Sequence, residues 1–160
     1  MCRYMSNFVE DRMDYWVFKF VENKKQSAVL AALRFAQKEN GGFLSVVLMD
    51  EIAEYLSIPK MSVYEVASFY SMYELKQNGK YKICICTNIS CMLAGSDKLI
   101  DYIKIKLGVG LNEVTLDKKF YIKEVECLAS CAGAPVIQIG TSYYENITIE
   151  KLNNIITELD

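Results

Sequence analysis

Two close pairs of cysteines constrain the fold of this chain more than any other feature of its sequence. The first pair is Cys86 and Cys91, and the second is Cys127 and Cys131. Each pair follows a stretch of residues with the pattern of a strand. If the two strands are neighbours in one sheet, the loops that follow them lie side by side and bring four thiolates together. The sequence therefore predicts a site built from both loops.

The residue types in the chain limit what this site can hold. The chain has six cysteines and no histidine, which excludes a Ser-His-Asp triad, a mixed cysteine and histidine zinc site and a Rieske centre. All-cysteine zinc sites usually use tighter pairs, often with two residues between ligands. The wider separations here favour two irons, each held by two thiolates, as in a [2Fe-2S] cluster. A structural zinc site and unligated core cysteines stay open as alternatives.

A cluster of this kind needs hydrogen-bond donors around it, because its charge is roughly −2 when oxidised and roughly −3 when reduced. Small and polar residues in the two loops could supply backbone amides that approach the sulfurs. They are Thr87, Asn88, Ser90, Ala129 and Ser130. Each hydrogen bond to a sulfur favours the reduced form and raises the reduction potential.

The two remaining cysteines are Cys84 and Cys2. Cys84 competes with Cys86 for the role of ligand, because residues two apart on a strand share one face. We favour Cys86 since it is closer to the loop, and we expect no role for Cys2. The chain has no Cys-x-x-Cys motif, which disfavours a thioredoxin-type dithiol.

Composition and charge indicate a folded chain that does not bind nucleic acid. Of the 160 residues, 52% are apolar, which is enough to build a core, and the net charge of −2 gives no basic excess for phosphates. Charges interrupt the first twenty residues, so we expect neither a secretory signal nor a transit peptide. The longest apolar run, residues 28–33, is too short to cross a bilayer. We expect a soluble protein of a reducing cytoplasm, without membrane insertion, in which cysteines serve as metal ligands or catalytic groups and not in disulfides.

The pattern predicts a domain boundary near Asn78-Gly79. Residues 1–78 are predicted to form a helical bundle. The predicted helices run from a Ser27 cap to Asn40, from Ser45 to Pro59, and from a Ser62 to Glu65 capping box through Val66, Ala67, Tyr70 and Tyr73. The last two could suggest a DNA-reading helix-turn-helix, but residues 62–73 lack any Lys or Arg. This nearly neutral, aromatic-rich half has the character of a docking surface.

Residues 79–160 combine strands and helices. Strands are predicted over residues 81–86, 120–126, 136–139 and 143–144, with helices from Ser96 to Gly108 and from a Thr148 cap to Leu159. This order indicates an α/β domain with a small mixed sheet, and a thioredoxin-like sandwich is the simplest arrangement that fits. The chain has no dinucleotide fingerprint and no P-loop. A redox centre without a substrate site implies an electron-transfer subunit that works beside a partner.

Three segments of the second half resemble one known family. They are Cys86-Thr-Asn-Ile-Ser-Cys91-Met-Leu-Ala-Gly-Ser, Glu126-Cys127-Leu-Ala-Ser-Cys131-Ala-Gly-Ala-Pro135 and Tyr143-Tyr144-Glu-Asn-Ile-Thr148. The family is the thioredoxin-like [2Fe-2S] ferredoxin family, in the form found as the small iron-sulfur subunit of NADH-quinone oxidoreductase, respiratory complex I. The helical half resembles it through residues 32–37 and 63–73, so the resemblance covers roughly residues 15 to 159.

The resemblance implies a fold, a cofactor and partners. The fold would be an N-terminal helical bundle followed by a thioredoxin-like [2Fe-2S] ferredoxin domain, and Cys86, Cys91, Cys127 and Cys131 would ligate the cluster. The cluster would exchange electrons with the FMN of the NADH-binding subunit, off the main path to quinone. NADH and FMN would be bound by that partner, among the other peripheral-arm subunits on the cytoplasmic side of a bacterial inner membrane. The corresponding subunit of an NAD-linked hydrogenase or formate dehydrogenase remains an alternative.

The chain departs from the family at two positions of the second loop. The family usually has Gly and Ala where this chain has Ala129 and Ser130. A glycine would allow a positive φ, which is costlier for alanine. Ser130 could add a hydrogen bond to a sulfur. We therefore expect the cluster to form with a changed reduction potential.

Overall fold

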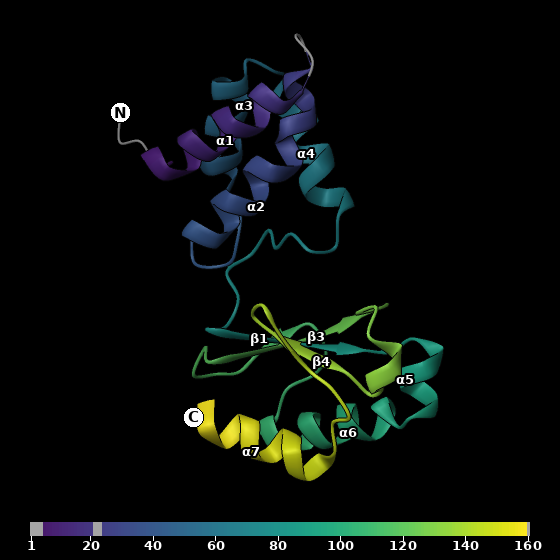
Figure 1. Ribbon diagram of the computed structural model, residues 1–160. Coiled ribbons are helices and arrows are strands. Elements are labelled where there is room, and N and C mark those ends of the chain that lie inside the picture. Colours follow the sequence, from purple (N-terminus) through teal and green to yellow (C-terminus); the bar gives the residue numbers. More distant parts are fainter. Residues whose placement is uncertain (1–4, 21–23, 160) are drawn as a thin grey trace. The chain divides into compact units, whose positions relative to one another are not determined.

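The computed structural model describes residues 5–20 and 24–159. The chain divides between Gln77 and Asn78 into two compact units, each with a hydrophobic core of its own. The first unit is helical, and the second contains the strands of the described residues together with three further α-helices (Figure 1). The predicted order, a helical bundle followed by a thioredoxin-like domain, is confirmed.

The first unit buries one core between its helices. The helices are α1 (Asn7–Lys19), the 3-10 helix η1 (Lys25–Ala28), α2 (Val29–Glu39), α3 (Val46–Leu56) and α4 (Lys60–Phe69). Met13, Leu33, Ile52 and Leu56 are among the side chains that this core buries completely or almost completely. Apolar side chains at intervals of three and four residues create the inward-facing stripe of each helix.

Helix α1 is the α-helix of this unit that the sequence pattern does not predict. The Ser6 hydroxyl oxygen caps it by accepting a hydrogen bond from the Val9 backbone N–H at 3.4 Å. Only Val9 and Met13 are buried in it. An apolar stripe of two residues is too narrow to stand out against the charged and aromatic residues around it.

The predicted start at Ser45 is confirmed, and the two other predicted starts are wrong. The Ser45 hydroxyl oxygen accepts a hydrogen bond from the Leu48 backbone N–H at 3.2 Å. Ser27 lies inside η1, and no side-chain cap precedes α2. Ser62 lies inside α4, so the predicted capping box does not form; Pro59 stands at the N-cap. The fixed φ of proline suits the start of a helix, which explains the earlier beginning of α4.

The ends of α3 and α4 also differ from the prediction. Helix α3 ends at Leu56, before Pro59, because Ser57 adopts the left-handed conformation with a φ of 55°. Helix α4 ends at Phe69, so Tyr70 and Tyr73 do not share its face. Tyr73 is still buried, and its hydroxyl donates a hydrogen bond to the Leu30 carbonyl at 2.6 Å.

The second unit is built on a five-stranded mixed sheet in the order β2-β3-β1-β4-β5. The strands are β1 (Tyr81–Cys86), β2 (Glu113–Val114), β3 (Phe120–Val125), β4 (Ile137–Ile139) and β5 (Ser142–Tyr144). Strand β3 is parallel to β1, and the other pairings are antiparallel. Cys86 pairs with Val125 at the carboxyl ends of β1 and β3. The loops that follow the two strands therefore begin side by side, as the sequence predicts.

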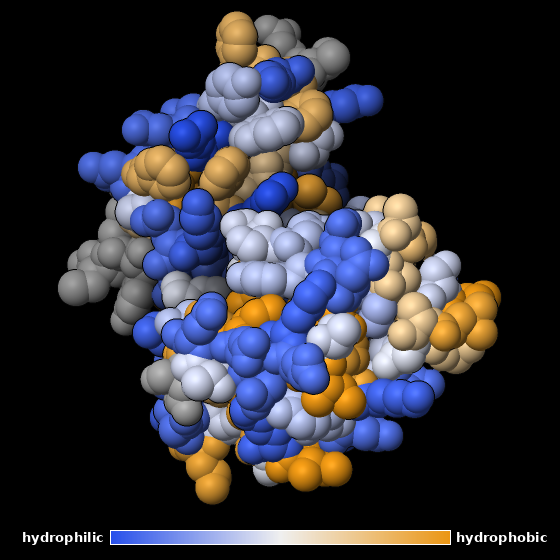
Figure 2. Space-filling model, turned by 60° about the horizontal axis from the view of Figure 1, so that its bottom comes forward, coloured by the Kyte–Doolittle hydropathy of each residue, from blue (hydrophilic) through white to orange (hydrophobic). Residues whose placement is uncertain are grey.

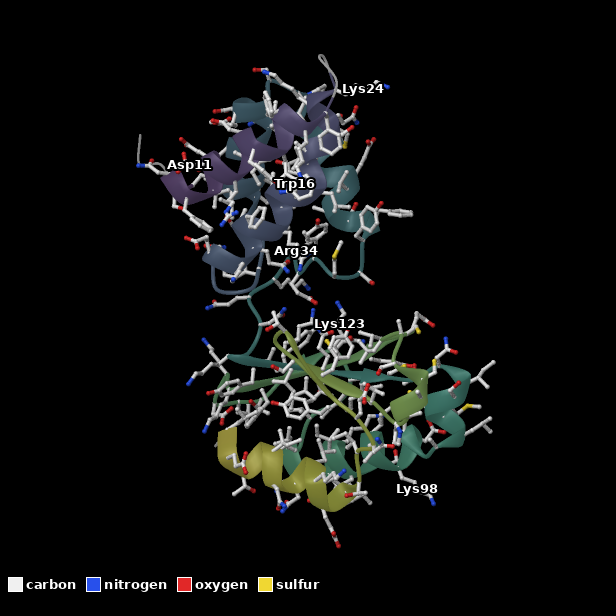
Figure 3. The ribbon with its side chains drawn as sticks, in the orientation of Figure 1. Asp11, Trp16, Lys24, Arg34, Lys98 and Lys123 are labelled. Atoms are coloured by element: carbon white, nitrogen blue, oxygen red, sulfur yellow. The ribbon has the colours of Figure 1, made fainter. Side chains whose placement is uncertain are left out.

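Helices α6 (Ser96–Leu107) and α7 (Ile149–Leu159) cover one face of this sheet (Figure 1). Ile83 and Ile85 of β1 point toward these helices and belong to the core of the unit. Because side chains alternate along a strand, Cys84 and Cys86 lie on the opposite face. Lys123, the register partner of Cys84, lies on that opposite face in Figure 3.

Most elements of this unit match the prediction. Strand β1 has the predicted bounds, and β3, β4 and β5 differ from them by one residue. Helix α6 runs from Ser96 to Leu107, with Gly108 in the left-handed conformation at its end. The Thr148 hydroxyl oxygen accepts a hydrogen bond from the Lys151 backbone N–H at 3.2 Å, as expected of a cap. Strand β2 and the short helix α5 (Ile89–Leu93) are not predicted.

Candidate iron-sulfur site

The first cysteine pair spans the junction between β1 and α5. Cys86 is the last residue of β1, and its backbone N–H donates to the Val136 carbonyl at 3.2 Å. Its thiol lies 4.0 Å from the Glu126 carbonyl oxygen of the second loop. Cys91 lies in α5, which begins after Asn88 because the Asn88 side-chain oxygen accepts a hydrogen bond from the Ile89 N–H at 2.9 Å. A strand end and a capped helical turn therefore fix both thiols.

This pair is buried. Cys86 is 3% exposed and Cys91 is 2% exposed, and both pack with Leu128 and Val136 in a small apolar cluster. Burial raises the pKa of the Cys91 thiol, and the hydrogen bond with the Cys86 thiol raises it further, while a backbone hydrogen bond with Val136 acts in the opposite direction. Apolar surroundings disfavour the anionic form of a lone thiol, whereas a bound metal provides the compensating positive charge.

The second pair lies in the loop after β3. Cys127 and Cys131 are both exposed. The Ala129 backbone N–H donates to the Cys127 sulfur at 3.2 Å, and the loop turns there because Ala129 has a φ of 55°. This left-handed conformation is the one that glycine adopts without strain. The alanine therefore carries a conformational cost in this chain.

Ser130 does not bond to a sulfur, contrary to the expectation from the sequence. Its hydroxyl donates to the Oε1 oxygen of Glu145. The prediction for the Thr87 amide is also wrong, because the Thr87 N–H donates to the Val125 carbonyl at 3.1 Å. The prediction for Ala129 is confirmed, since its N–H lies at the Cys127 sulfur. The Thr87 N–H is used in a hydrogen bond to the neighbouring strand β3. The turn of the second loop instead points the Ala129 N–H toward the sulfur of Cys127 in the same loop.

Two observations bring the pairs together. Leu128 follows Cys127 in the second loop and packs into the apolar cluster of Cys86 and Cys91. After burial and the hydrogen bond with Cys86, the charge of Cys131 contributes least to raising the pKa of the Cys91 thiol. In the described part of the chain, no group of three or more His, Cys, Asp or Glu side chains that could hold a metal ion is found. A [2Fe-2S] cluster needs only two protein thiolates at each iron, and two neighbouring pairs fit that requirement.

Cys84 lies outside the two loops. Cys84 is buried in the middle of β1, where its register partners are Lys123 and Gln138 of the adjacent strands. It therefore lies within the sheet, two residues before the strand end from which the first loop starts. Cys2 lies outside the described residues.

Comparison with known proteins gives the family. The family model described as thioredoxin-like [2Fe-2S] ferredoxin matches residues 17–160. The chain is 46% identical over 140 residues to the E subunit of NADH-quinone oxidoreductase of Rickettsia felis, an alignment that covers 88% of this chain and 84% of the relative. It is 38% identical to the mitochondrial NADH dehydrogenase [ubiquinone] flavoprotein 2 of Dictyostelium discoideum, and covers 57% of that protein.

A crystal structure of an NAD+-reducing [NiFe]-hydrogenase in the air-oxidised state shares the fold. The TM-score is 0.72 at 18% identity, over 82% of this chain, and the match spans 22% of the hydrogenase chain. At that identity the likeness concerns the fold alone. The family model and the Rickettsia relative show that this chain belongs to the thioredoxin-like [2Fe-2S] ferredoxin family.

Proposed function

We propose that the chain carries one [2Fe-2S] cluster and serves as an electron-transfer subunit of an NADH-oxidising complex. Cys86, Cys91, Cys127 and Cys131 are the proposed ligands. The observation that supports the proposal is that Leu128, between Cys127 and Cys131, packs with Cys86 and Cys91 at the carboxyl ends of two parallel strands. Such a cluster takes up and releases one electron at a time.

The residues around the proposed cluster would set its reduction potential. Burial of Cys86 and Cys91 keeps water from half of the site, while the exposed Cys127 and Cys131 leave the other half open to a partner. The Ala129 N–H at the Cys127 sulfur stabilises added negative charge and raises the reduction potential. Burial of the first pair acts in the opposite direction, since an apolar environment disfavours charge.

The parent complex that we propose is NADH-quinone oxidoreductase. The Rickettsia relatives and the mitochondrial relative bear that name or its ubiquinone counterpart. The partner would be the subunit that binds NADH and FMN, and the cluster would exchange electrons with that flavin. The hydrogenase shares only the fold at 18% identity, so the higher identity of the Rickettsia relatives favours the quinone enzyme over an NAD-linked hydrogenase or formate dehydrogenase.

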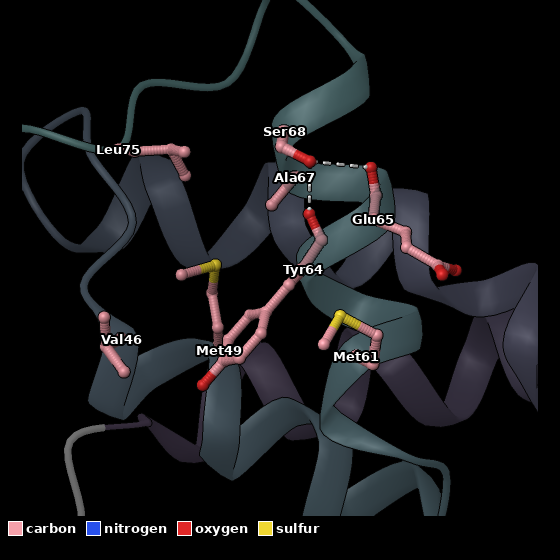
Figure 4. Close-up of a pocket in the computed structure, with 8 residues that line it drawn as sticks. All are labelled: Val46, Met49, Met61, Tyr64, Glu65, Ala67, Ser68 and Leu75. Carbon is pink, nitrogen blue, oxygen red and sulfur yellow. Dashed lines mark hydrogen bonds between the residues drawn. The ribbon is translucent and has the colours of Figure 1, made fainter.

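The helical unit offers a surface on which another subunit could dock. An apolar pocket of about 300 Å³ lies between α3 and α4, and Figure 4 shows the side chains that line it. Val46 and Met61 in its lining are 62% and 63% exposed, and Leu75 is 48% exposed. Exposed apolar side chains around a concavity are typical of protein interfaces. This surface agrees with the docking role proposed for the helical half.

A second apolar surface lies beside the cysteines. Ile89 and Leu93 of α5 are 67% and 79% exposed, although they flank the buried Cys91. Figure 2 shows apolar side chains gathered at the edge of the second unit where Figure 1 places α5. A partner on this surface would approach the first cysteine pair closely, as electron exchange with a flavin requires.

Association with a membrane would be indirect. None of the helices in the described residues combines the length and the hydropathy that crossing a bilayer requires. We propose that the chain reaches the cytoplasmic side of the membrane through the other subunits of its complex.

Metal analysis and EPR of the purified chain test the cluster. Anaerobically purified protein should contain two irons and two acid-labile sulfides per chain. After reduction with dithionite it should show the EPR signal of a one-electron-reduced [2Fe-2S] cluster. Colourless protein with one zinc per chain would instead support the structural zinc site, and the chain would then be a zinc-stabilised interaction module with no redox role.

Co-purification tests the partner. A tagged chain, expressed from its chromosomal gene in the native organism, should co-purify with a subunit that contains FMN and oxidises NADH. Met61→Asp places a charge in the apolar pocket and should weaken this association, whereas the matched exposed change Glu158→Gln should not. Recovery of hydrogenase or formate dehydrogenase subunits with the chain would assign it to one of those complexes.

A further inference from the structure

One carboxylate lies against the second cysteine loop. The loop contains a 3-10 turn, η2 (Cys131–Gly133), and the Glu145 side chain packs on Gly133. A Cβ atom on Gly133 would lie 2.6 Å from the Cβ atom of Glu145 and 2.7 Å from its Oε2 oxygen. Real Cβ atoms do not approach other heavy atoms so closely. Gly133 therefore leaves the space that the Glu145 side chain fills.

The carboxylate is bonded to the loop as well as packed on it. The Ser130 hydroxyl donates to Glu145 Oε1, and Ser130 directly precedes Cys131. The backbone continues the contact, because the Asn146 N–H donates to the Gly133 carbonyl at 2.6 Å. The Ile147 N–H donates to the Pro135 carbonyl at 3.1 Å. Residues 145–147 thus run beside residues 133–135 and join the loop to the start of α7.

Few other contacts hold the second cysteine loop in place. Cys127 and Cys131 are exposed, and Leu128 is its anchor in the apolar cluster. Ala129 adds a costly backbone conformation instead of a support. A charge-assisted hydrogen bond from Ser130 is stronger than a neutral one, so it can offset part of that cost.

The position of the charge has a second effect. A reduced cluster is more negative than an oxidised one, so a nearby carboxylate repels the added electron. Lys151 is the cation that contacts residues 145–147. Its ammonium donates a hydrogen bond to the Asn146 carbonyl at 3.0 Å and not to the Glu145 carboxylate. The negative charge of Glu145 is therefore left beside the loop.

We propose that Glu145 is a positioning residue for the second pair of cysteines and that its charge favours the oxidised cluster. The proposal rests on the proposed function, because it takes Cys127 and Cys131 as ligands. Glu145 holds the turn through Ser130 and Gly133, and it touches no iron. One electron enters the cluster on reduction, and no proton transfer is involved.

Two substitutions of Glu145 distinguish its positioning role from the effect of its charge. Glu145→Gln keeps an oxygen that can accept from Ser130 and removes the charge, whereas Glu145→Ala removes both. Glu158→Gln, an exposed change near the end of α7, is the control for the loss of one carboxylate. The readouts are a redox titration of the full chain followed by EPR, with dithionite as reductant, and amide hydrogen exchange of residues 129–134 in the metal-free chain.

Glu145→Gln should raise the ratio of reduced to oxidised cluster about threefold at the wild-type midpoint, which is about 28 mV at 59 mV per tenfold change. Its EPR g values and its amide exchange should match those of the wild type. Glu145→Ala should shift the midpoint in the same direction, change the g values and speed amide exchange of the loop about tenfold. Glu158→Gln should change neither quantity.

Several results would overturn the proposal. A midpoint for Glu145→Gln equal to that of Glu158→Gln would refute the effect of charge. Wild-type exchange and g values in Glu145→Ala would refute the positioning role. A wild-type chain that contains no iron would overturn the proposed function instead, and the exchange rates of the metal-free chain would still decide whether Glu145 holds the loop.

Discussion

The two cysteine pairs have similar spacing but opposite surroundings. Cys86 and Cys91 are almost completely buried and are fixed by a strand end and a helical turn. Cys127 and Cys131 are exposed, on a loop with one strained residue and one apolar anchor. Secondary structure and a small apolar cluster thus fix the first pair, whereas local hydrogen bonds shape the second. The proposed ligands of one cluster can therefore differ in how much the fold depends on them.

The largest expected effect is loss of the cluster, and we expect it for substitutions in either cysteine pair. Replacement of any one of Cys86, Cys91, Cys127 or Cys131 by Ser should abolish or distort the reduced EPR signal and lower the iron content, because each removes one of four thiolates. Cys84→Ser is the matched control and should keep the iron. If Cys84→Ser loses the cluster and Cys86→Ser keeps it, our choice between these two cysteines is wrong.

The free energy of unfolding of the metal-free chain should respond differently to substitutions in the two cysteine pairs. Cys91→Ser puts a hydroxyl into an apolar cluster and should lower the free energy of unfolding by about 1–3 kcal/mol. Cys127→Ser exchanges one exposed polar group for another and should change it by less than about 0.5 kcal/mol. Urea unfolding followed by circular dichroism measures both values. Equal losses for the two variants would contradict the contrast in burial.

Reactivity toward iodoacetamide should show the same contrast. In the folded metal-free chain, Cys127 and Cys131 should be alkylated roughly tenfold faster than Cys86 and Cys91, since burial restricts access to the first pair. The raised pKa of the Cys91 thiol acts in the same direction, because a smaller fraction of it is thiolate at a mildly alkaline pH. Mass spectrometry of peptides gives the rates. Addition of urea should bring the four rates together.

The smallest expected effect concerns the strain in the second loop. Ala129→Gly removes the cost of a positive φ and should stabilise the chain by up to about 1 kcal/mol, reduced by the greater freedom of glycine when unfolded. Ala94→Gly, at a position with an ordinary negative φ, is the control and should destabilise the chain. Thermal unfolding of the metal-free variants compares them. A loss of stability in Ala129→Gly would show that the loop is not strained.

The second unit was more predictable than the first, and the reason is physical. Short apolar strands and a helix bounded by Ser96 and Gly108 have clear local patterns, and the structure reproduces their bounds. In the helical unit, two of three serine caps were wrong because Pro59 and the 3-10 turn η1 start the helices instead. Serine favours a cap position but does not require it. Helix α1 could not be predicted because only two of its side chains are buried.

The site shows the same limit of sequence reasoning. The adjacency of the two cysteine loops could be predicted from strands that end before each pair, and the parallel pairing of β1 and β3 confirms it. The partner of Ser130 could not, because Glu145 is fifteen residues away and reaches the loop only through the packing on Gly133. The ligand roles of the four cysteines stay a prediction until the iron is measured.

The pairing of β1 with β3 also bears on when the cofactor can be installed. The ribosome adds Cys91 to the growing chain roughly forty residues before Cys131, an interval of about 2–8 seconds at ordinary rates of synthesis. With the proposed ligands, no translation intermediate that ends before Cys131 holds the complete set of sulfurs. The cell must therefore deliver iron and sulfide to a chain in which both strands have already been made.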